Sequence, residues 1–173
     1  MADYLAGFYP EWVDKEENPR QIILDLGKMI TNRIPVKLGF QKLNKYDPEY
    51  WGLATLLTDE QAEVALKMGV RKPKTDMVKL TGKSEEELEK ILGDMSFMGI
   101  LEYNWENPTR TKQWVLPMFV PGSAEFTNMN DTILKKYPEM GRFFERMSRL
   151  PLEKVTPMVP PGGAGIGMHV IPV

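Results

Sequence analysis

Cysteine is absent from this 173-residue sequence, and histidine occurs once, as His169. Without thiols the chain cannot form a disulfide, hold an iron–sulfur cluster through thiolates or supply a cysteine nucleophile. A single imidazole also excludes the sites in which several histidines bind one metal ion. We therefore expect no cofactor, no metal and no catalytic residue in this chain, and we interpret His169 as a structural or linker side chain.

A strong charge of either sign is also missing, since 22 basic and 24 acidic residues leave a formal net charge of −2. Such a chain has no long-range field that would attract nucleic acid or an anionic membrane. The first residues lack a secretory-signal pattern, and no apolar run approaches the ~20 residues that cross a bilayer. We therefore expect a cytoplasmic protein without a membrane partner, and nucleic acid is not expected as a partner.

What the sequence does contain is ordinary globular material, 42% hydrophobic and 27% charged, which suffices for one domain with a core. Residues 1–18 mix aromatic and charged side chains and predict an N-terminal arm that lies on the body of the domain. Residues 19–149 carry the helical patterns of that domain. From 150 to 173, prolines and glycines replace helical periodicity, which predicts an extended C-terminal arm.

Helix-start patterns recur through the first half of the domain. Asn18-Pro19 and Asp47-Pro48 each place a capping side chain before a proline, which is typical of a helix start. Thr58 and Gln61 match a capping box. The helices expected here cover 19–32, a short stretch from 47, 58–69 and 74–80, with 36–40 as a short strand or link and 70–74 as a polar loop.

The centre of the chain carries the clearest fold signal. Gly82 marks a tight turn after a helix, and Ser84 with Glu87 predicts a second capping box. Apolar residues then recur at helical spacing up to a glycine stop, and two short strands follow, at 100–105 and 113–116. Two helices joined by a tight turn and followed by a hairpin predict a winged helix-turn-helix. The expected fold class is mainly α with a small β-hairpin, flanked by the two extended arms.

Two more helices are expected after a break that contains proline and glycine. The first begins at Ser123 and reaches Tyr137. Pro138 then suits the first turn of a last helix. The apolar face of that helix is predicted to consist of Met140, Phe143, Phe144 and Met147.

The glycine cluster at 162–167 invites comparison with a phosphate-binding loop. A dinucleotide fingerprint needs its glycines between a strand and a helix, because the amides at the helix start hold the pyrophosphate. Here the glycine spacing differs, Pro160-Pro161 precedes the cluster, and Pro172 prevents a helix after it. We interpret the glycines as extended backbone that passes close to another surface.

A winged helix raises the hypothesis of DNA binding, because its second helix would lie in the major groove. In this sequence that helix carries one basic residue, Lys90, against the acids Glu85, Glu86, Glu87, Glu89 and Asp94. These carboxylates would repel phosphates. A DNA-binding transcriptional regulator is therefore kept as the alternative, and a protein contact by the same fold is preferred.

A stand-alone enzyme is a third class, which no set of residues supports. The serines have no histidine or lysine partner at a recognisable spacing, so no nucleophile is indicated. The glutamates at 85–89 lie at a predicted helix N-terminus, where the helix dipole stabilises their charge without a metal ion.

Three strings resemble a known family: YNWENP at 103–108, QWVLPMFVPGSAEF at 113–126, and residues 141–173, which end in GMHVIPV. They are similar to the N-terminal region of large iron–sulfur oxidoreductases of anaerobic bacteria, described as 4Fe-4S ferredoxin-type proteins, some joined to flavin and pyridine-nucleotide modules. The resemblance covers most of the chain from about Asp47 onward. It implies a piece of a longer protein, with the cluster-binding cysteines downstream, so no ligand is carried over to a residue here.

The residues and the resemblance together predict a non-catalytic winged-helix module of an iron–sulfur oxidoreductase. Its expected partners are the downstream redox domains or another subunit, and self-association is left open. Large aromatic groups suit burial between domains, and the 12 methionines add flexible contact groups. The candidate interface residues are Trp51, Phe97, Trp105, Trp114, Phe119, Met158 and Met168.

Overall fold

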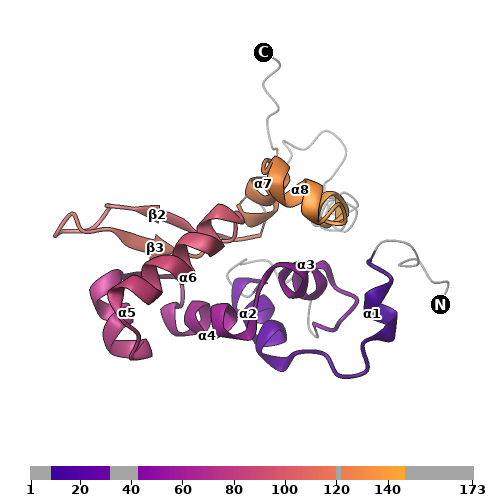
Figure 1. The fold of residues 1–173 in the computed structure, drawn as a ribbon, viewed down its shortest axis with the longest axis horizontal. Coiled ribbons are helices and arrows are strands. Elements are labelled where there is room, and N and C mark those ends of the chain that lie inside the picture. Colours follow the sequence, from indigo (N-terminus) through magenta and orange to yellow (C-terminus); the bar gives the residue numbers. More distant parts are fainter. Residues whose placement is uncertain (1–8, 32–42, 120–121, 147–173) are drawn as a thin grey trace, which may run out of the picture.

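The computed structural model describes residues 9–31, 43–119 and 122–146 of the chain. Over these residues the protein is mainly helical with a three-stranded antiparallel sheet (Figure 1), which confirms the mainly α class. The predicted link at 36–40 and C-terminal arm at 150–173, with His169 and the glycine cluster, lie outside the described residues. The elements are α1 (Trp12–Lys15), α2 (Gln21–Thr31), α3 (Pro48–Leu56), α4 (Asp59–Met68), β1 (Arg71–Pro73), α5 (Lys74–Thr81), α6 (Glu85–Phe97), β2 (Glu102–Asn104), β3 (Gln113–Val115), α7 (Ser123–Asn128) and α8 (Asp131–Lys136), and residues 140–146 are also helical.

Helices α2, α3 and α4, all expected from the sequence, form the N-terminal part of the core. Helix α2 begins at Gln21 rather than Pro19, because the Arg20 carbonyl accepts the first helical hydrogen bond, from the Leu24 N–H. Apolar residues at i, i+3 and i+7 then share one face. The buried side chains of that face are Ile23, Leu26 and Ile30.

The described part of the N-terminal segment, residues 9–18, contacts the body of the domain. Val13 of α1 is fully buried. The Tyr50 hydroxyl accepts a hydrogen bond from the Arg20 backbone N–H and donates one to the Glu16 carboxylate, both at 2.8 Å. Burial raises the pKa of Tyr50 to about 12, so this hydroxyl stays protonated near neutral pH and joins α3 to the segments around α1 and α2.

Both predicted capping boxes are present. Thr58 Oγ1 accepts a hydrogen bond from the Gln61 N–H, and the Thr58 N–H donates to Gln61 Oε1. Ser84 and Glu87 make the same reciprocal pair at the start of α6. Between α5 and α6, Gly82 has a φ of 71°, the left-handed conformation expected for the turn. These local contacts determine where α4 and α6 begin and where α5 ends.

The predicted hairpin is part of a larger sheet. Strands β2 and β3 pair antiparallel, as expected, with Tyr103 opposite Trp114. The prediction of a loop at 70–74 was wrong, because residues there form β1, which pairs with the other side of β3 and gives the strand order β1-β3-β2. A three-residue strand that contains Pro73 offers no periodicity from which a sequence can reveal it.

The C-terminal part differs from the prediction at one point. The stretch 123–137, expected to be one helix, forms the two short helices α7 and α8. Asn130 separates them, because its Oδ1 accepts hydrogen bonds from the N–H groups two and three residues later and so caps α8. The last predicted helix is present at 140–146, with Met140 and Phe143 buried.

The core is continuous and rich in aromatic side chains. Trp51 of α3 meets Phe143 edge-on with ring centroids 5.8 Å apart, and Phe143 also contacts Phe119 at 5.9 Å. The last helix can come this close because position 52 is glycine, where a Cβ would lie 2.5 Å from the Phe143 ring. This packing joins N-terminal and C-terminal helices in one hydrophobic cluster.

Candidate functional site

The β2–β3 hairpin extends away from α7 and α8 (Figure 1). Its aromatic side chains gather on one face of the hairpin. Tyr103 and Trp105 are two residues apart in an extended segment, and their rings meet edge to face with centroids 5.7 Å apart. Trp114, opposite Tyr103, lies 5.5 Å from it. Trp114 is 1% exposed, whereas Tyr103 and Trp105 are 49% and 52% exposed. An aromatic pair therefore lies on the surface directly beside the core.

A lysine ties this face to helix α6. Lys112 Nζ lies 4.7 Å from the Tyr103 ring centroid and 4.2 Å from that of Trp114, within cation–π range. The same ammonium lies 2.5 Å from Glu89 Oε1 on α6, and Lys74 Nζ lies 3.7 Å from Glu89 Oε2. The hydrogen bond from Lys112 lowers the pKa of Glu89, which keeps the carboxylate charged. The hairpin and α6 are thus joined by an ion pair.

The N-terminal end of α6 has an acidic surface. Its first turn holds Glu85, Glu86 and Glu87, whose charge the helix dipole stabilises. Lys74 pairs with Glu85 at 3.2 Å, and Lys83 pairs with Glu60 of α4 at 2.5 Å. Carboxylates therefore offset the nearby lysines on this side of the domain.

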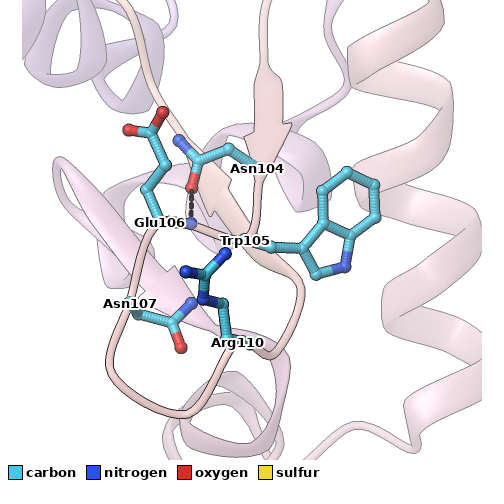
Figure 2. A pocket seen from close by; sticks show the side chains of 5 residues that line it. All are labelled: Asn104, Trp105, Glu106, Asn107 and Arg110. Carbon is cyan, nitrogen blue, oxygen red and sulfur yellow. Dashed lines mark hydrogen bonds between the residues drawn. The ribbon is translucent and has the colours of Figure 1, made fainter.

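The loop between β2 and β3 surrounds an open hollow of about 500 Å³, lined by Asn104, Trp105, Glu106, Asn107 and Arg110. Figure 2 shows the Trp105 ring directed away from the loop and the Arg110 guanidinium turned toward its middle. Asn107 shapes the loop, because its Oδ1 accepts from the Thr111 N–H and its Nδ2 donates to the Thr111 carbonyl. The lining offers amides and opposite charges that can hydrogen-bond to a partner's polar groups.

A second apolar surface, the α6–α7 junction, lies where the end of α6 meets α7. Gly99 has a φ of 82°, and a Cβ there would lie 2.6 Å from the Thr127 backbone nitrogen. Thr127 Oγ1 donates to the Met98 carbonyl at 3.1 Å, and Asn130 Nδ2 donates to the Phe97 carbonyl. The exposed side chains at this junction are Phe97 (60%), Phe126 (41%) and Met129 (80%).

Three of the candidate interface residues are core residues. Trp51, Trp114 and Phe119 are almost completely buried, so they do not form a contact surface. Large rings contribute most to the apolar area that a core buries, and their size alone does not distinguish a core position from an interface position.

Phe97 and Trp105 are exposed and remain candidates, whereas Met158 and Met168 lie outside the residues that the structure describes. Tyr103 could have been found from its place two residues before Trp105, because alternate residues of a strand share a face. The exposure of Phe126 and Met129 depends on how α7 packs against the end of α6, and no local sequence pattern reveals this packing. The surface residues missing from the prediction are Tyr103, Phe126 and Met129.

Within residues 9–31, 43–119 and 122–146, no three carboxylates or imidazoles lie close enough to hold a metal ion. In the same ranges, none of the helices has the length and apolar character needed to cross a bilayer. The described titratable group with a strongly raised pKa is Tyr50, which is held between Arg20 and Glu16 in the core rather than in a cleft.

No protein-family model, curated protein or solved structure matches this chain. A function is therefore assigned from three surfaces: the aromatic face of the hairpin around Tyr103 and Trp105, the acidic N-terminal end of α6, and the α6–α7 junction.

Proposed function

We propose that this chain is a non-catalytic winged-helix module that docks onto the redox domains of an iron–sulfur oxidoreductase, in the same protein or in another subunit. The order of elements supports the fold, because α5 and α6 are joined by the Gly82 turn and the β2–β3 hairpin follows directly. The resemblance of 103–108, 113–126 and 141–173 supports the redox context. In this proposal the module is cytoplasmic, and its partner domains hold the 4Fe-4S clusters.

The docking role rests on one observation, the half-exposed aromatic pair Tyr103 and Trp105. Aromatic side chains are enriched in protein interfaces, and rings already packed against each other lose little freedom when a partner covers them. Lys112 braces Tyr103 through its contact with the ring, so the pair is held in place before contact. A fixed apolar pair beside a polar loop suits a protein partner.

The alternative, a DNA-binding regulator, would use the same α5–α6 unit. A recognition helix places its N-terminal residues against base edges and phosphates. That end of α6 carries three glutamates in its first turn, and Lys74 and Lys112 are already paired with carboxylates of α6. Proteins gain affinity for DNA when lysine or arginine side chains neutralise phosphates and release their counterions. Carboxylates at this end of α6 would repel the phosphates instead. The charge pattern therefore favours a protein partner.

Two titrations of the 173-residue chain separate these functions. Isothermal titration calorimetry with a 4Fe-4S ferredoxin-type domain encoded in the same or an adjacent reading frame should give saturable binding. Trp105→Ala should weaken it about tenfold or more, because it removes a central aromatic contact. Leu80→Ala is the matched control, since Leu80 is an exposed apolar side chain of α5 outside the hairpin.

The second titration uses labelled duplex DNA at low salt. Binding that weakens steeply as salt rises, combined with no heat from the ferredoxin-type domain, would favour the regulator and overturn the docking function.

A further inference from the structure

Strand β2 forms one edge of the sheet, and the hydrogen-bonding direction of its residues follows from the β3 ladder. The Leu116 N–H donates to the Val70 carbonyl at 2.9 Å, on the β1 side of β3. Backbone groups of successive strand residues point to alternate sides, so Trp114 also faces β1 and its two neighbours face β2. Tyr103, opposite Trp114, is therefore in a non-hydrogen-bonded pair. Its N–H and C=O point to the open edge of the sheet.

The two edges of the sheet differ in their capacity to pair. By the same alternation, the outward positions of β1 are Arg71 and Pro73. Pro73 has no N–H and Arg71 is charged and exposed, and both features are typical of edges that resist pairing. The outward position of β2 is Tyr103, which is uncharged and carries both backbone groups. Among the residues that the structure describes, β2 is one of the two edge strands, and no other strand pairs with its outer side (Figure 1).

We propose that the β2 edge pairs with the β2 edge of a second copy of this chain, antiparallel and about a two-fold axis that passes between the two Tyr103 residues. These two residues then exchange N–H···O=C hydrogen bonds, and the two three-stranded sheets become one continuous sheet. The symmetry places Glu102 opposite the partner's Asn104, so no like charges face each other directly.

The polar side chains of β2 fit this register. Asn104 Oδ1 already accepts hydrogen bonds from the Glu106 N–H at 3.0 Å, drawn in Figure 2, and from Gln113 Nε2 at 2.7 Å. In the proposed register the Nδ2 group of Asn104 donates a hydrogen bond to the partner. Glu102 is exposed on the same face of the strand, and its carboxylate can accept from the partner's Asn104. A slip of two residues would instead set Glu102 against the partner's Glu102, which repulsion disfavours.

The aromatic face also gains from this pairing. Tyr103 and the partner's Tyr103 come side by side, about 5.5 Å apart between Cα atoms, as in any hydrogen-bonded antiparallel pair. Trp105 of each copy extends this row, so half-exposed rings of both copies form one stripe. The ladder is short and buries less than the ~1,600 Å² of a standard interface, so we expect a dissociation constant between about 10 µM and 1 mM.

The test is the oligomeric state of the 173-residue chain, measured by sedimentation equilibrium from about 10 µM to about 2 mM. We expect a reversible dimer in which the Tyr103 amide hydrogen exchanges more slowly as concentration rises. Tyr103→Pro removes the N–H and should abolish the dimer. Phe97→Ala changes an exposed ring of the α6–α7 junction and should leave the dissociation constant within about twofold.

A pair of charge-changing substitutions tests the register and avoids the risk that a proline at position 103 disrupts the sheet. Asn104→Glu sets a carboxylate opposite the partner's Glu102 and should weaken the dimer about tenfold or more, and adding Glu102→Lys should restore it. A chain that stays monomeric at the highest concentration overturns the proposal. The proposal is also overturned if the dimer persists in Tyr103→Pro or is lost in Phe97→Ala. It is overturned as well if Asn104→Glu leaves the dissociation constant unchanged, or if adding Glu102→Lys does not restore the dimer. Binding of a ferredoxin-type domain is measured independently, so one proposal can fail while the other stands.

Discussion

Replacing Gly99 with alanine tests the close contact between the end of α6 and α7. Gly99 has a φ of 82°, and an added Cβ would lie 2.6 Å from the Thr127 nitrogen and 2.7 Å from the Phe126 carbonyl carbon, so the backbone of α7 would have to move. Two other glycines allow matched comparisons. Gly82 shares the positive φ, at 71°, but has no neighbouring atom within 4 Å of an added Cβ, and Gly93 lies inside α6 with neither constraint.

The three substitutions separate three contributions to the free energy of unfolding. Gly93→Ala should raise it by about 0.5–1 kcal/mol, because alanine has the higher helix propensity. Gly82→Ala should lower it by about 1 kcal/mol, since the left-handed backbone costs about 1–2 kcal/mol and the reduced entropy of the unfolded chain offsets part of this. Gly99→Ala adds overpacking of about 1–3 kcal/mol, for a total loss of about 2–4 kcal/mol.

Urea unfolding followed by far-UV circular dichroism measures each free energy. The expected order of stability is Gly93→Ala, wild type, Gly82→Ala and Gly99→Ala, from highest to lowest. If Gly99→Ala is no less stable than Gly82→Ala, α7 does not lie against the end of α6 as described. Phe97 and Phe126 would then not share one surface.

Two further substitutions test the polar contacts. Glu89→Gln removes the charge that pairs with Lys112, and because the Glu89 side chain is 43% exposed, screening limits the loss to about 0.5–1 kcal/mol near pH 7. The pKa of Glu89 is lowered in the folded state, so this stabilisation is present above the unfolded pKa of about 4.3 and disappears as pH falls through the folded value. Tyr50→Phe removes the hydroxyl that joins Arg20 and Glu16 and should cost about 1–3 kcal/mol. It should also remove the tyrosine that ionises at a pKa of about 12 in an alkaline absorbance titration.

Glu86→Gln and Tyr46→Phe are the matched controls for these two substitutions. Glu86 shares the acidic end of α6, and the Tyr46 ring packs on Tyr9 at the surface of the domain. A stability difference between wild type and Glu89→Gln that does not shrink as pH falls from 7 into the acid range, where Glu89 becomes protonated, would contradict the ion pair. Equal losses from Tyr50→Phe and Tyr46→Phe would contradict the structural role of the buried hydroxyl.

Local contacts in this protein were predictable from the sequence. Thr58 with Gln61, and Ser84 with Glu87, pair within four residues, so the residue types reveal both the contact and the start of the helix. Gly82 was predictable for the same reason, because the turn itself requires a positive φ.

The elements that escaped prediction depend on distant partners or on competition between local choices. β1 is a strand because β3, far along the chain, offers it an edge, and Pro73 is tolerated because its nitrogen faces outward. The break between α7 and α8 depends on Asn130, which caps the second helix instead of continuing the first. The candidate interface was predicted only in part. Trp105 is exposed and Trp114 is buried, and the residue type alone does not distinguish these two positions.

Helix α6 fixes the two exposed surfaces relative to each other. Glu89 ties the hairpin to its middle through Lys112, and the contacts around Gly99 tie α7 to its end. From Glu89 to Phe97 the helix rises about 12 Å. The helix therefore fixes the distance between the two surfaces that a single partner would have to cover. Pairing of the β2 edges uses backbone groups, whereas docking uses ring faces, so the two proposed contacts do not compete for the same atoms. If a redox domain binds the joined aromatic stripe, its affinity should rise with module concentration across the range in which the dimer forms.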